Sequence, residues 1–363
     1  MARVLFLDPY HGPSHAALSL TLQARSRHQI TLLTLPPRKW KWRMRGAALA
    51  LEPALRAQPA PDLLIVTDML NLPETLALLR DHWGSRLPVI LYFHENQLTY
   101  PVSGGDERDL HFGLVNIHSA LAADLVLFNS RFHLEDFLGA VPKVLRQMPD
   151  ERPDGLADRI RARSEVLGLP VEVPPEVHGG TLPKEPWVLW NHRWEEDKDP
   201  AAFFRVMARL DARGACFMMA VAGPTFREIP PCFEAARRDL GHRIAHWGHL
   251  PDARAYHRLL ARCRVVVSTA RHEFFGLAVR EAIALGCHPL LPRRVVYPEL
   301  AGDRRDFLYE TEEDLAARLE SLLSGPDSAA ELDDLRREIL ACGPETIVAR
   351  WDERIDRLLA SRS

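Results

Sequence analysis

The sequence predicts an α/β fold with two doubly wound parallel sheets, one in each half of the chain. Three observations support this. Short β-branched runs alternate with segments of helical periodicity in both halves. A length of 363 residues suits two domains. The Pro/Gly-rich stretch 173–180 interrupts the alternation near the middle of the chain. We therefore expect an N-terminal domain over residues 1–175 and a second domain that begins at 176.

Hydrophobic periodicity and turn residues place the individual elements. In the first half, strands are expected at 4–7, 28–35, 63–66, 88–93 and 125–128, and helices at 15–25, with Ser14 as the N-cap, 74–83, 110–123 and 131–138. In the second half, strands are expected at 187–190, 217–222 and 264–269, and helices at 253–261, 277–285, 313–323, 329–340 and 347–360.

The composition is that of an ordinary globular protein, with 47% hydrophobic and 26% charged residues and a formal net charge of −3. No apolar run approaches the roughly 18 residues of a membrane span. The acidic Asp8 follows the first apolar residues at once, which predicts that there is no signal peptide. The five cysteines are odd in number and lack CxxC spacing, which indicates reduced thiols rather than a metal site. These features predict a cytoplasmic protein without a membrane span.

The clearest candidate site follows the strand predicted at 264–269. Gly276 lies at the start of the next helix, just past the carboxyl end of that strand, where exposed N–H groups favour phosphate. Glu273 and Glu281 frame this point, with seven residues between them. Carboxylates accept hydrogen bonds from sugar hydroxyls, so the pattern suits a nucleotide sugar. The alternative is that both glutamates are simply solvated.

This stretch resembles the donor-binding signature of the retaining glycosyltransferases of GT-B fold, and 246–250 and the following helix continue the likeness upstream. The resemblance implies two Rossmann-like domains facing across a cleft, the second over 176–345, with a final helix over 346–363 crossing back to the first domain. It also implies a catalytic role for Glu273. Segment 292–299 keeps the family's Pro-Glu pair but lacks its glycine-rich turn. The implied donor-binding residues here are Gly248, Phe275, Gly276, Leu277 and Glu281.

Arg193 and Lys198 follow the first strand of the second half. In the resembled family, two cations at this place hold the donor diphosphate. Fixed cations stabilise the charge on a departing diphosphate, so we expect no metal ion to be needed. The alternative is a solvated loop in which these cations pair with the acidic residues 195–197 between them.

Two loops at strand ends of the first half supply further candidates. His94 and Asn96 follow the strand predicted at 88–93, and the family places a histidine near the transferred sugar, so we expect His94 to orient the reaction. Gly12, Ser14 and His15 follow the first strand. We expect Gly12 to approach the donor phosphates, and Ser14, His15 and Asn96 to contact the acceptor. An ordinary β–α turn is the alternative at 12–15.

Residues 38–45 hold five cations with two interleaved tryptophans; we call them the basic-aromatic segment. Residues 1–60 carry nine Lys/Arg against two Asp/Glu, a local charge of +7. Cations contact phosphates and aromatic rings stack on unpaired bases. A solvated loop and a membrane-surface contact are the alternatives. The residues expected to contact an RNA acceptor are Arg38, Lys39, Trp40, Lys41, Trp42, Arg43 and Arg45.

Segments 39–46, 92–101 and 190–195 resemble the tRNA-queuosine α-mannosyltransferase family, and the likeness covers nearly the whole chain. The resemblance implies GDP-mannose as donor, queuosine in the anticodon of tRNA as acceptor, retention at the anomeric carbon, and no cofactor. Composition and spacing alone leave other functions open: a glycosyltransferase with a lipid or small-glycan acceptor, a nucleotide-sugar isomerase, or an RNA-binding protein on the same fold.

Overall fold

The computed structural model describes residues 1–84, 87–102, 108–174, 184–225, 228–325 and 330–361. The chain forms two compact units. Unit 1 comprises Met1–Pro170 with Pro344–Ser363, and unit 2 comprises Val171–Gly343. The predicted boundary at 175 and most of the predicted link 173–180 lie outside the described residues. Each unit is therefore described by itself.

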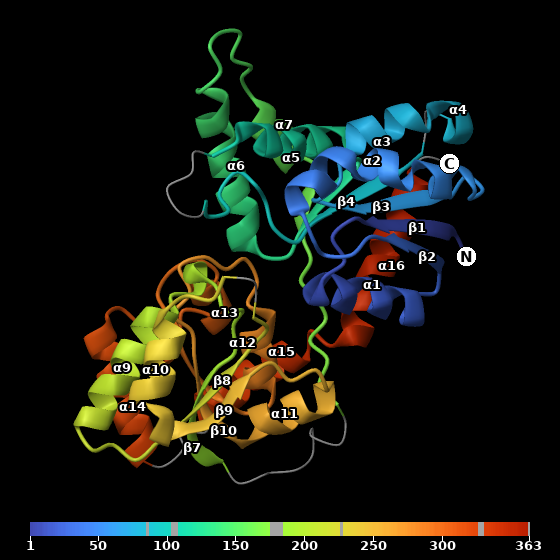
Figure 1. The fold of residues 1–363 in the computed structure, drawn as a ribbon. Helices are drawn as coiled ribbons and strands as arrows, with labels where there is room; N and C mark the ends of the chain where they lie inside the picture. Colours follow the sequence, from blue (N-terminus) through green and yellow to red (C-terminus); the bar gives the residue numbers. More distant parts are fainter. Residues whose placement is uncertain (85–86, 103–107, 175–183, 226–227, 326–329, 362–363) are drawn as a thin grey trace. The chain divides into compact units, whose positions relative to one another are not determined.

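Unit 1 contains a parallel sheet of six strands among its described residues, in the order β2-β1-β3-β4-β5-β6. Helices α1 and α16 cover one face, and α2, α3 and α5 cover the other (Figure 1). The strands are β1 (Arg3–Asp8), β2 (Gln29–Thr34), β3 (Leu63–Thr67), β4 (Val89–Phe93), β5 (Leu125–Phe128) and β6 (Ser164–Val166). The helices are α1 (Pro13–Arg25), α2 (Trp40–Arg56), α3 (Leu72–Leu78), α4 (Arg80–Trp83), α5 (Leu110–Ala122), α6 (Arg131–Leu145), α7 (Leu156–Arg161) and α16 (Pro344–Ala360).

The central strands of unit 1 are buried on both faces, as a parallel sheet between two helix layers requires. The final helix α16 packs on α1 and buries Trp351, whose ring lies 5.4 Å from that of Tyr92. Polar contacts fix the same helix, because Asp352 accepts hydrogen bonds from the Ser26 hydroxyl at 2.6 Å and from the Arg27 N–H at 3.1 Å. The last residues of the chain thus complete the core of unit 1.

Unit 2 contains a second parallel sheet, with six strands in the described part, in the order β12-β11-β10-β7-β8-β9. Helices α9, α10 and α14 group on one side of it, and α11, α12 and α15 on the other (Figure 1). The strands are β7 (Glu185–Trp190), β8 (Met218–Ala222), β9 (Ile244–Gly248), β10 (Cys263–Val267), β11 (His288–Pro292) and β12 (Leu308–Tyr309). The helices are α9 (Pro200–Ala212), α10 (Cys232–Asp239), α11 (Ala253–Arg262), α12 (Leu277–Ala284), α13 (Tyr297–Ala301), α14 (Glu312–Ser324) and α15 (Ala330–Leu340), with 3-10 turns η1 (Glu196–Lys198), η2 (Gly241–Arg243) and η3 (Arg305–Phe307).

Several predicted boundaries were wrong for identifiable reasons. Ser14 is not the N-cap of α1: the helix begins at Pro13 and Gly12 caps it, because proline suits the first helical position. The helix predicted at 74–83 is divided into α3 and α4 at Leu79. Helix α6 was predicted to end at residue 138, before Gly139, but it continues through Gly139 and Pro142 to Leu145. The alternative of a solvated loop at 38–45 is wrong from Trp40 onward, where α2 begins.

Candidate active site

In both sheets the strands are parallel, so their carboxyl ends lie at one edge of each sheet. The predicted site residues cluster at these two edges. We call residues 8, 15, 68, 94 and 96 the first edge, in unit 1. We call residues 191, 193, 197, 198, 273 and 281 the second edge, in unit 2.

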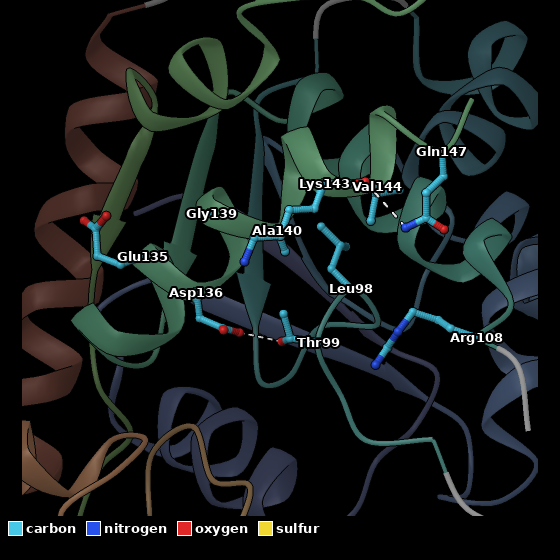
Figure 2. Close-up of a pocket in the computed structure, with 10 residues that line it drawn as sticks. All are labelled: Leu98, Thr99, Arg108, Glu135, Asp136, Gly139, Ala140, Lys143, Val144 and Gln147. Carbon is cyan, nitrogen blue, oxygen red and sulfur yellow. Dashed lines mark hydrogen bonds between the residues drawn. The ribbon is translucent and has the colours of Figure 1, made fainter. Parts of the chain in front are cut away.

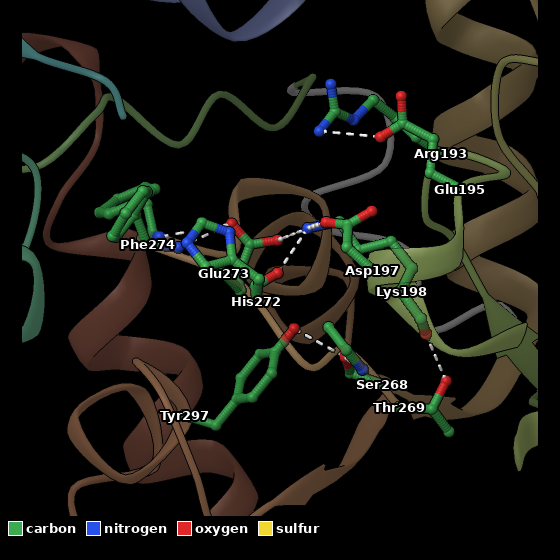
Figure 3. A network of polar contacts seen from close by, with 12 residues as sticks. Arg193, Glu195, Asp197, Lys198, Ser268, Thr269, His272, Glu273, Phe274 and Tyr297 are labelled. Atoms are coloured by element: carbon green, nitrogen blue, oxygen red, sulfur yellow. Dashed lines mark hydrogen bonds and ion pairs between the residues drawn. The ribbon is translucent and has the colours of Figure 1, made fainter. Parts of the chain in front are cut away.

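Lys198 is the centre of the second edge. It ends the turn η1 and is 6% exposed. Its ammonium lies 3.0 Å from Asp197 Oδ2 and 3.4 Å from Glu273 Oε2, and it donates to the His272 carbonyl at 2.6 Å (Figure 3). Burial alone would lower the pKa of Lys198, but Glu273 and Asp197 outweigh that effect and raise it. The lysine therefore keeps its positive charge in a fixed position.

Thr269 fixes the backbone beneath this lysine. Its hydroxyl donates to the Lys198 carbonyl at 2.8 Å and accepts from the Trp190 indole at 3.1 Å. Trp190 ends β7 and Thr269 follows β10, so the two neighbouring central strands hold η1 in place. The sequence indicated the lysine but not the threonine that positions it.

Glu273 is engaged by the protein on both of its oxygens. Oε1 accepts from the N–H groups of Phe274 at 3.2 Å and Phe275 at 3.4 Å, and Oε2 pairs with Lys198. Burial would raise the pKa of Glu273, but Lys198, His192 and the backbone N–H groups lower it to about 2. In its ionised form, Glu273 thus fixes the loop before α12.

Gly276 caps α12 in the left-handed conformation, with φ of 74°. This positive φ favours glycine, whereas a Cβ there would make an ordinary contact of 3.4 Å with a methyl group of Leu300. Leu277 begins the helix, and Phe275 is buried with the Arg280 guanidinium 4.4 Å from its ring centre. The loop predicted to hold phosphate is therefore a fixed turn at a helix N-terminus.

Glu281 lies in the second turn of α12 and is half-buried. The Tyr256 hydroxyl, from α11, lies 3.3 Å from Glu281 Oε2 and accepts from Asn191 Nδ2 at 3.0 Å. Burial raises the pKa of Glu281 to about 7, and Tyr256 opposes this only in part. Three elements thus converge on the carboxylate predicted to bind a ribose.

Arg193 pairs with Glu195, at 3.1 Å between Nη2 and Oε2, and its side chain is 37% exposed (Figure 3). Lys198 is thus the buried cation of the predicted pair and Arg193 the accessible one. Because three protein acceptors surround the Lys198 ammonium, a diphosphate could reach it only in place of one of them. The contact with Glu273 is the longest of the three.

A stack of two histidines marks the first edge. His15, at the start of α1, lies 3.1 Å from both carboxylate oxygens of Asp8, which ends β1. The rings of His15 and His94 are stacked with centres 3.7 Å apart. Burial alone would lower the pKa of His15, yet Asp8 raises it; the pKa of His94 is well below its ordinary value, chiefly through burial. Asp8 thus favours the protonated form of His15, and burial favours the neutral form of the His94 ring stacked on it.

The first edge also holds polar atoms that have no hydrogen-bond partner among the described residues. These are both ring nitrogens of His94, Oδ2 of Asp68 and Nδ2 of Asn96. Asp68 Oδ1 accepts from the His94 N–H at 2.8 Å, and burial raises the pKa of Asp68 to about 8. Asn96 is fully buried and its oxygen accepts from the N–H groups of Leu98 and Thr99. Buried polar atoms without partners are what a hydroxyl-bearing ligand could bind.

Gly12, Ser14 and Gly248, which were also predicted to contact ligands, differ in backbone conformation and exposure. Gly12 is buried with an ordinary negative φ of −92°, and Ser14 is exposed. Gly248 ends β9 with φ of 110° and open space around its Cα. Sequence reasoning missed Gly223 after β8, where a Cβ would lie 1.9 Å from the His192 carbonyl. A glycine directly after a short apolar strand was the available signal.

The basic-aromatic segment divides into an anchored and a free part. Trp40 packs on Phe112 with ring centres 5.0 Å apart, and Arg45 pairs with Asp109 at 3.3 Å. Trp42 is 64% exposed, beside the exposed Lys41. Trp40 and Arg45 thus hold the first turns of α2 in place. The free part presents Trp42 and Lys41 to solvent, with the Lys41 ammonium 5.7 Å from the centre of the Trp40 ring.

The comparisons with known proteins agree with this geometry. Residues 3–171 match the family model described as tRNA-queuosine alpha-mannosyltransferase N-terminal, and residues 179–338 match that of glycosyl transferases group 1. A tRNA-queuosine alpha-mannosyltransferase of Drosophila melanogaster is 34% identical over 327 residues, which cover 87% of this chain and 85% of that protein. The chain belongs to the tRNA-queuosine α-mannosyltransferase family.

Solved structures show that the fold is GT-B. A sucrose-phosphate synthase from Thermosynechococcus elongatus superposes with a TM-score of 0.73 at 15% identity, covering 99% of this chain and all of that one. The N-terminal domain of a Candida albicans trehalose-6-phosphate phosphatase gives 0.71 at 10% identity, covering 99% and 97%. The predicted fold class and family are confirmed, and the protein is a glycosyltransferase.

Two findings concern the predictions that the chain has no membrane span and needs no metal ion. Within the described ranges, no helix combines the length and apolar character needed to cross a bilayer. The same residues contain no group of three or more His, Cys, Asp and Glu side chains placed to hold a metal ion. Independence of metal ions remains a prediction for this family member.

Proposed function

We propose that this glycosyltransferase moves mannose from GDP-mannose, with retention, onto queuosine in the anticodon of a tRNA. The observation that carries the proposal is the 34% identity, over 87% of the chain, to a protein named as a tRNA-queuosine alpha-mannosyltransferase. The family model over residues 3–171 carries the same name, which supports the acceptor in particular.

The second edge suits the donor. In the transfer, the bond between mannose C1 and the diphosphate breaks, the bond between C1 and the acceptor oxygen forms, and the acceptor proton leaves with GDP. Arg193 and Lys198 would stabilise the negative charge that develops on GDP. Glu281, held by Tyr256, would accept a hydrogen bond from the ribose. No step needs a metal ion for charge balance.

The first edge suits neutral hydroxyls. His94 has two unpartnered ring nitrogens within the described structure and is supported by the His15–Asp8 pair. It would hydrogen-bond to a hydroxyl of the sugar or of the acceptor and so fix the angle of attack. The exposed Trp42 and Lys41 would contact a base and a phosphate of the RNA.

The test is to incubate the purified protein with GDP-mannose and queuosine-containing tRNA, to digest the tRNA, and to measure the masses of the nucleosides by mass spectrometry. A gain of one hexose on queuosine, with an α-linkage by NMR and no loss of rate in EDTA, is expected. GDP release without a heavier nucleoside would refute the acceptor. A rate abolished by EDTA and restored by Mg²⁺ or Mn²⁺ would refute metal independence.

A lipid or small-glycan acceptor is the second candidate. The exposed Trp42 next to Lys41 is also what a helix at an anionic membrane surface presents. This alternative predicts binding to anionic vesicles and negligible binding to tRNA, so a sedimentation assay with both separates the two acceptors.

A further inference from the structure

Unit 1 contains a hollow of about 360 Å³ that lies outside both edges described above (Figure 2). One wall is the face of α6 that carries Asp136, Gly139 and Lys143, which follow one another at helical spacing. The other wall comes from Leu98, Thr99 and Arg108. A volume of this order suits a small ligand of drug or nucleotide size.

The hollow is joined to the first edge by a direct contact. Asn96 Oδ1 accepts from the N–H of Thr99 at 3.1 Å, so a first-edge residue fixes the wall. Three residues lie between His94 and Leu98, so their Cα atoms are at most about 14 Å apart. A ligand in the hollow and a group at His94 could therefore belong to the same flexible molecule.

The lining of the hollow carries two cations and two carboxylates; Glu135 pairs with a cation outside the lining, and Asp136 acts electrostatically on Arg108. Asp136 accepts from the Thr99 hydroxyl at 2.5 Å, and Glu135 pairs with Arg161 through both oxygens, at 2.8 and 2.6 Å. Among the described residues, no carboxylate lies within ion-pair distance of Lys143 or Arg108. Arg108 donates to the Gln97 carbonyl at 2.9 Å, which fixes its guanidinium. The hollow thus offers two cations to an anionic ligand.

Gly139 keeps the hollow open. It lies in the interior of α6, where glycine costs about 0.5–1 kcal/mol relative to alanine. A Cβ added there would meet no atom within 4 Å, so no protein contact requires the glycine. A larger side chain would extend over the open wall between Asp136 and Lys143.

We propose that this hollow binds an unpaired nucleotide of the RNA acceptor, near the nucleotide that is modified. Lys143 and Arg108 contact its phosphate, and the aliphatic wall of Leu98 and Ala140 packs on its base. The inference rests on the proposed RNA acceptor. It adds a site within unit 1 that is separate from the basic-aromatic segment.

Three single variants test the site through binding of fluorescently labelled queuosine-containing tRNA as a function of salt. Lys143→Gln should weaken binding and reduce the slope of log K against log salt by about 0.7–0.9, the contribution of one phosphate contact. Gly139→Leu should weaken binding about tenfold, or more, without changing the slope, since it fills the hollow but alters no charge. Arg146→Gln is the matched control, because Arg146 is an exposed cation at the end of α6 that does not line the hollow. It should bind like the wild type.

The outcomes separate this inference from the proposed function. If the wild type binds tRNA and both Lys143→Gln and Gly139→Leu bind as well as Arg146→Gln does, the site is refuted, whatever the turnover. If both bind more weakly but the wild type transfers no mannose to tRNA, the site stands and the proposed reaction fails. If the wild type binds no tRNA, both fail. Calorimetry with GDP-mannose should show wild-type values for all three variants, and thermal unfolding should show wild-type stability for Lys143→Gln and Arg146→Gln and equal or higher stability for Gly139→Leu.

Discussion

The Lys198 cluster of the second edge and the His94–Asp68 pair of the first edge differ in how burial acts on their polar groups; Glu281 of the second edge, whose pKa burial raises to about 7, behaves like the latter pair. At the second edge, buried charges are paired: Lys198 lies between Asp197 and Glu273, and the pKa shifts of Lys198 and Glu273 favour the ionised form of each. At the first edge, burial favours uncharged forms, so that His94 is neutral and the pKa of Asp68 is raised to about 8. Fixed charges suit a diphosphate, and neutral donors and acceptors suit hydroxyls. The comparison therefore assigns the donor nucleotide and the reacting hydroxyls to different edges.

The largest effect is expected where the paired charges are broken. Lys198→Ala leaves Glu273 and Asp197 without their buried counter-charge, which costs about 3–5 kcal/mol of unfolding free energy. Affinity for GDP-mannose should fall about tenfold or more, since a hydrogen bond to a charged group is lost. Denaturant unfolding and calorimetry measure the two effects. If the folded variant binds GDP-mannose with wild-type affinity, Lys198 is not part of the donor site.

The next largest effect is expected for a substitution of His94 at the first edge. His94→Ala should lower kcat for tRNA mannosylation about tenfold to a hundredfold while donor affinity changes little, because His94 is expected to orient the reaction. His118→Ala, an exposed histidine of α5, is the control. A change in donor affinity without a change in kcat would mean that His94 binds the donor nucleotide and does not orient the reacting groups.

The basic-aromatic segment tests whether the acceptor is held by charge. Reversing Lys41 and Arg43 to Glu should raise the KM for tRNA about tenfold at low salt, and the loss should shrink as salt rises. GDP-mannose affinity should stay at the wild-type value. Intact turnover of tRNA by the double variant would mean that these cations do not hold the RNA.

A further expected effect is the pH dependence of the stability of unit 2. Burial raises the pKa of Glu281 from 4.5 to about 7, so its protonated form is favoured in the folded protein. Its contribution to stability is full below the ordinary pKa and is lost as pH rises through about 7. Glu281→Gln should therefore gain stability relative to the wild type between about pH 5 and about pH 8. The exposed Glu234→Gln serves as control, and an equal difference at both pH values would contradict the shift.

The sequence predicted the fold well because parallel strands buried on both faces, such as β3 and β4, appear as continuous apolar runs. It indicated Glu281, Lys198 and His94 through motif and strand-end position. It could not show Thr269, Tyr256 or Asp68, which reach these residues from other strands and helices. Their roles depend on tertiary contacts that leave no local pattern in the chain.

Similar reasoning explains the errors at helix ends. Ser14 is a good N-cap type, but Pro13 takes the first helical position and moves the cap to Gly12. A solvated loop was one alternative for the basic-aromatic segment, because a run of cations is typical of a solvated surface. Trp40 instead packs on Phe112, and this contact stabilises the start of α2.

The separation of donor binding at the second edge from RNA binding at the basic-aromatic segment is tested most directly by measuring GDP-mannose affinity by calorimetry, and tRNA affinity by fluorescence, for Lys198→Ala and for the Lys41→Glu, Arg43→Glu double variant. The account predicts that the first variant loses donor affinity and keeps tRNA affinity, and that the second does the reverse. Equal losses of both affinities in both variants would contradict it.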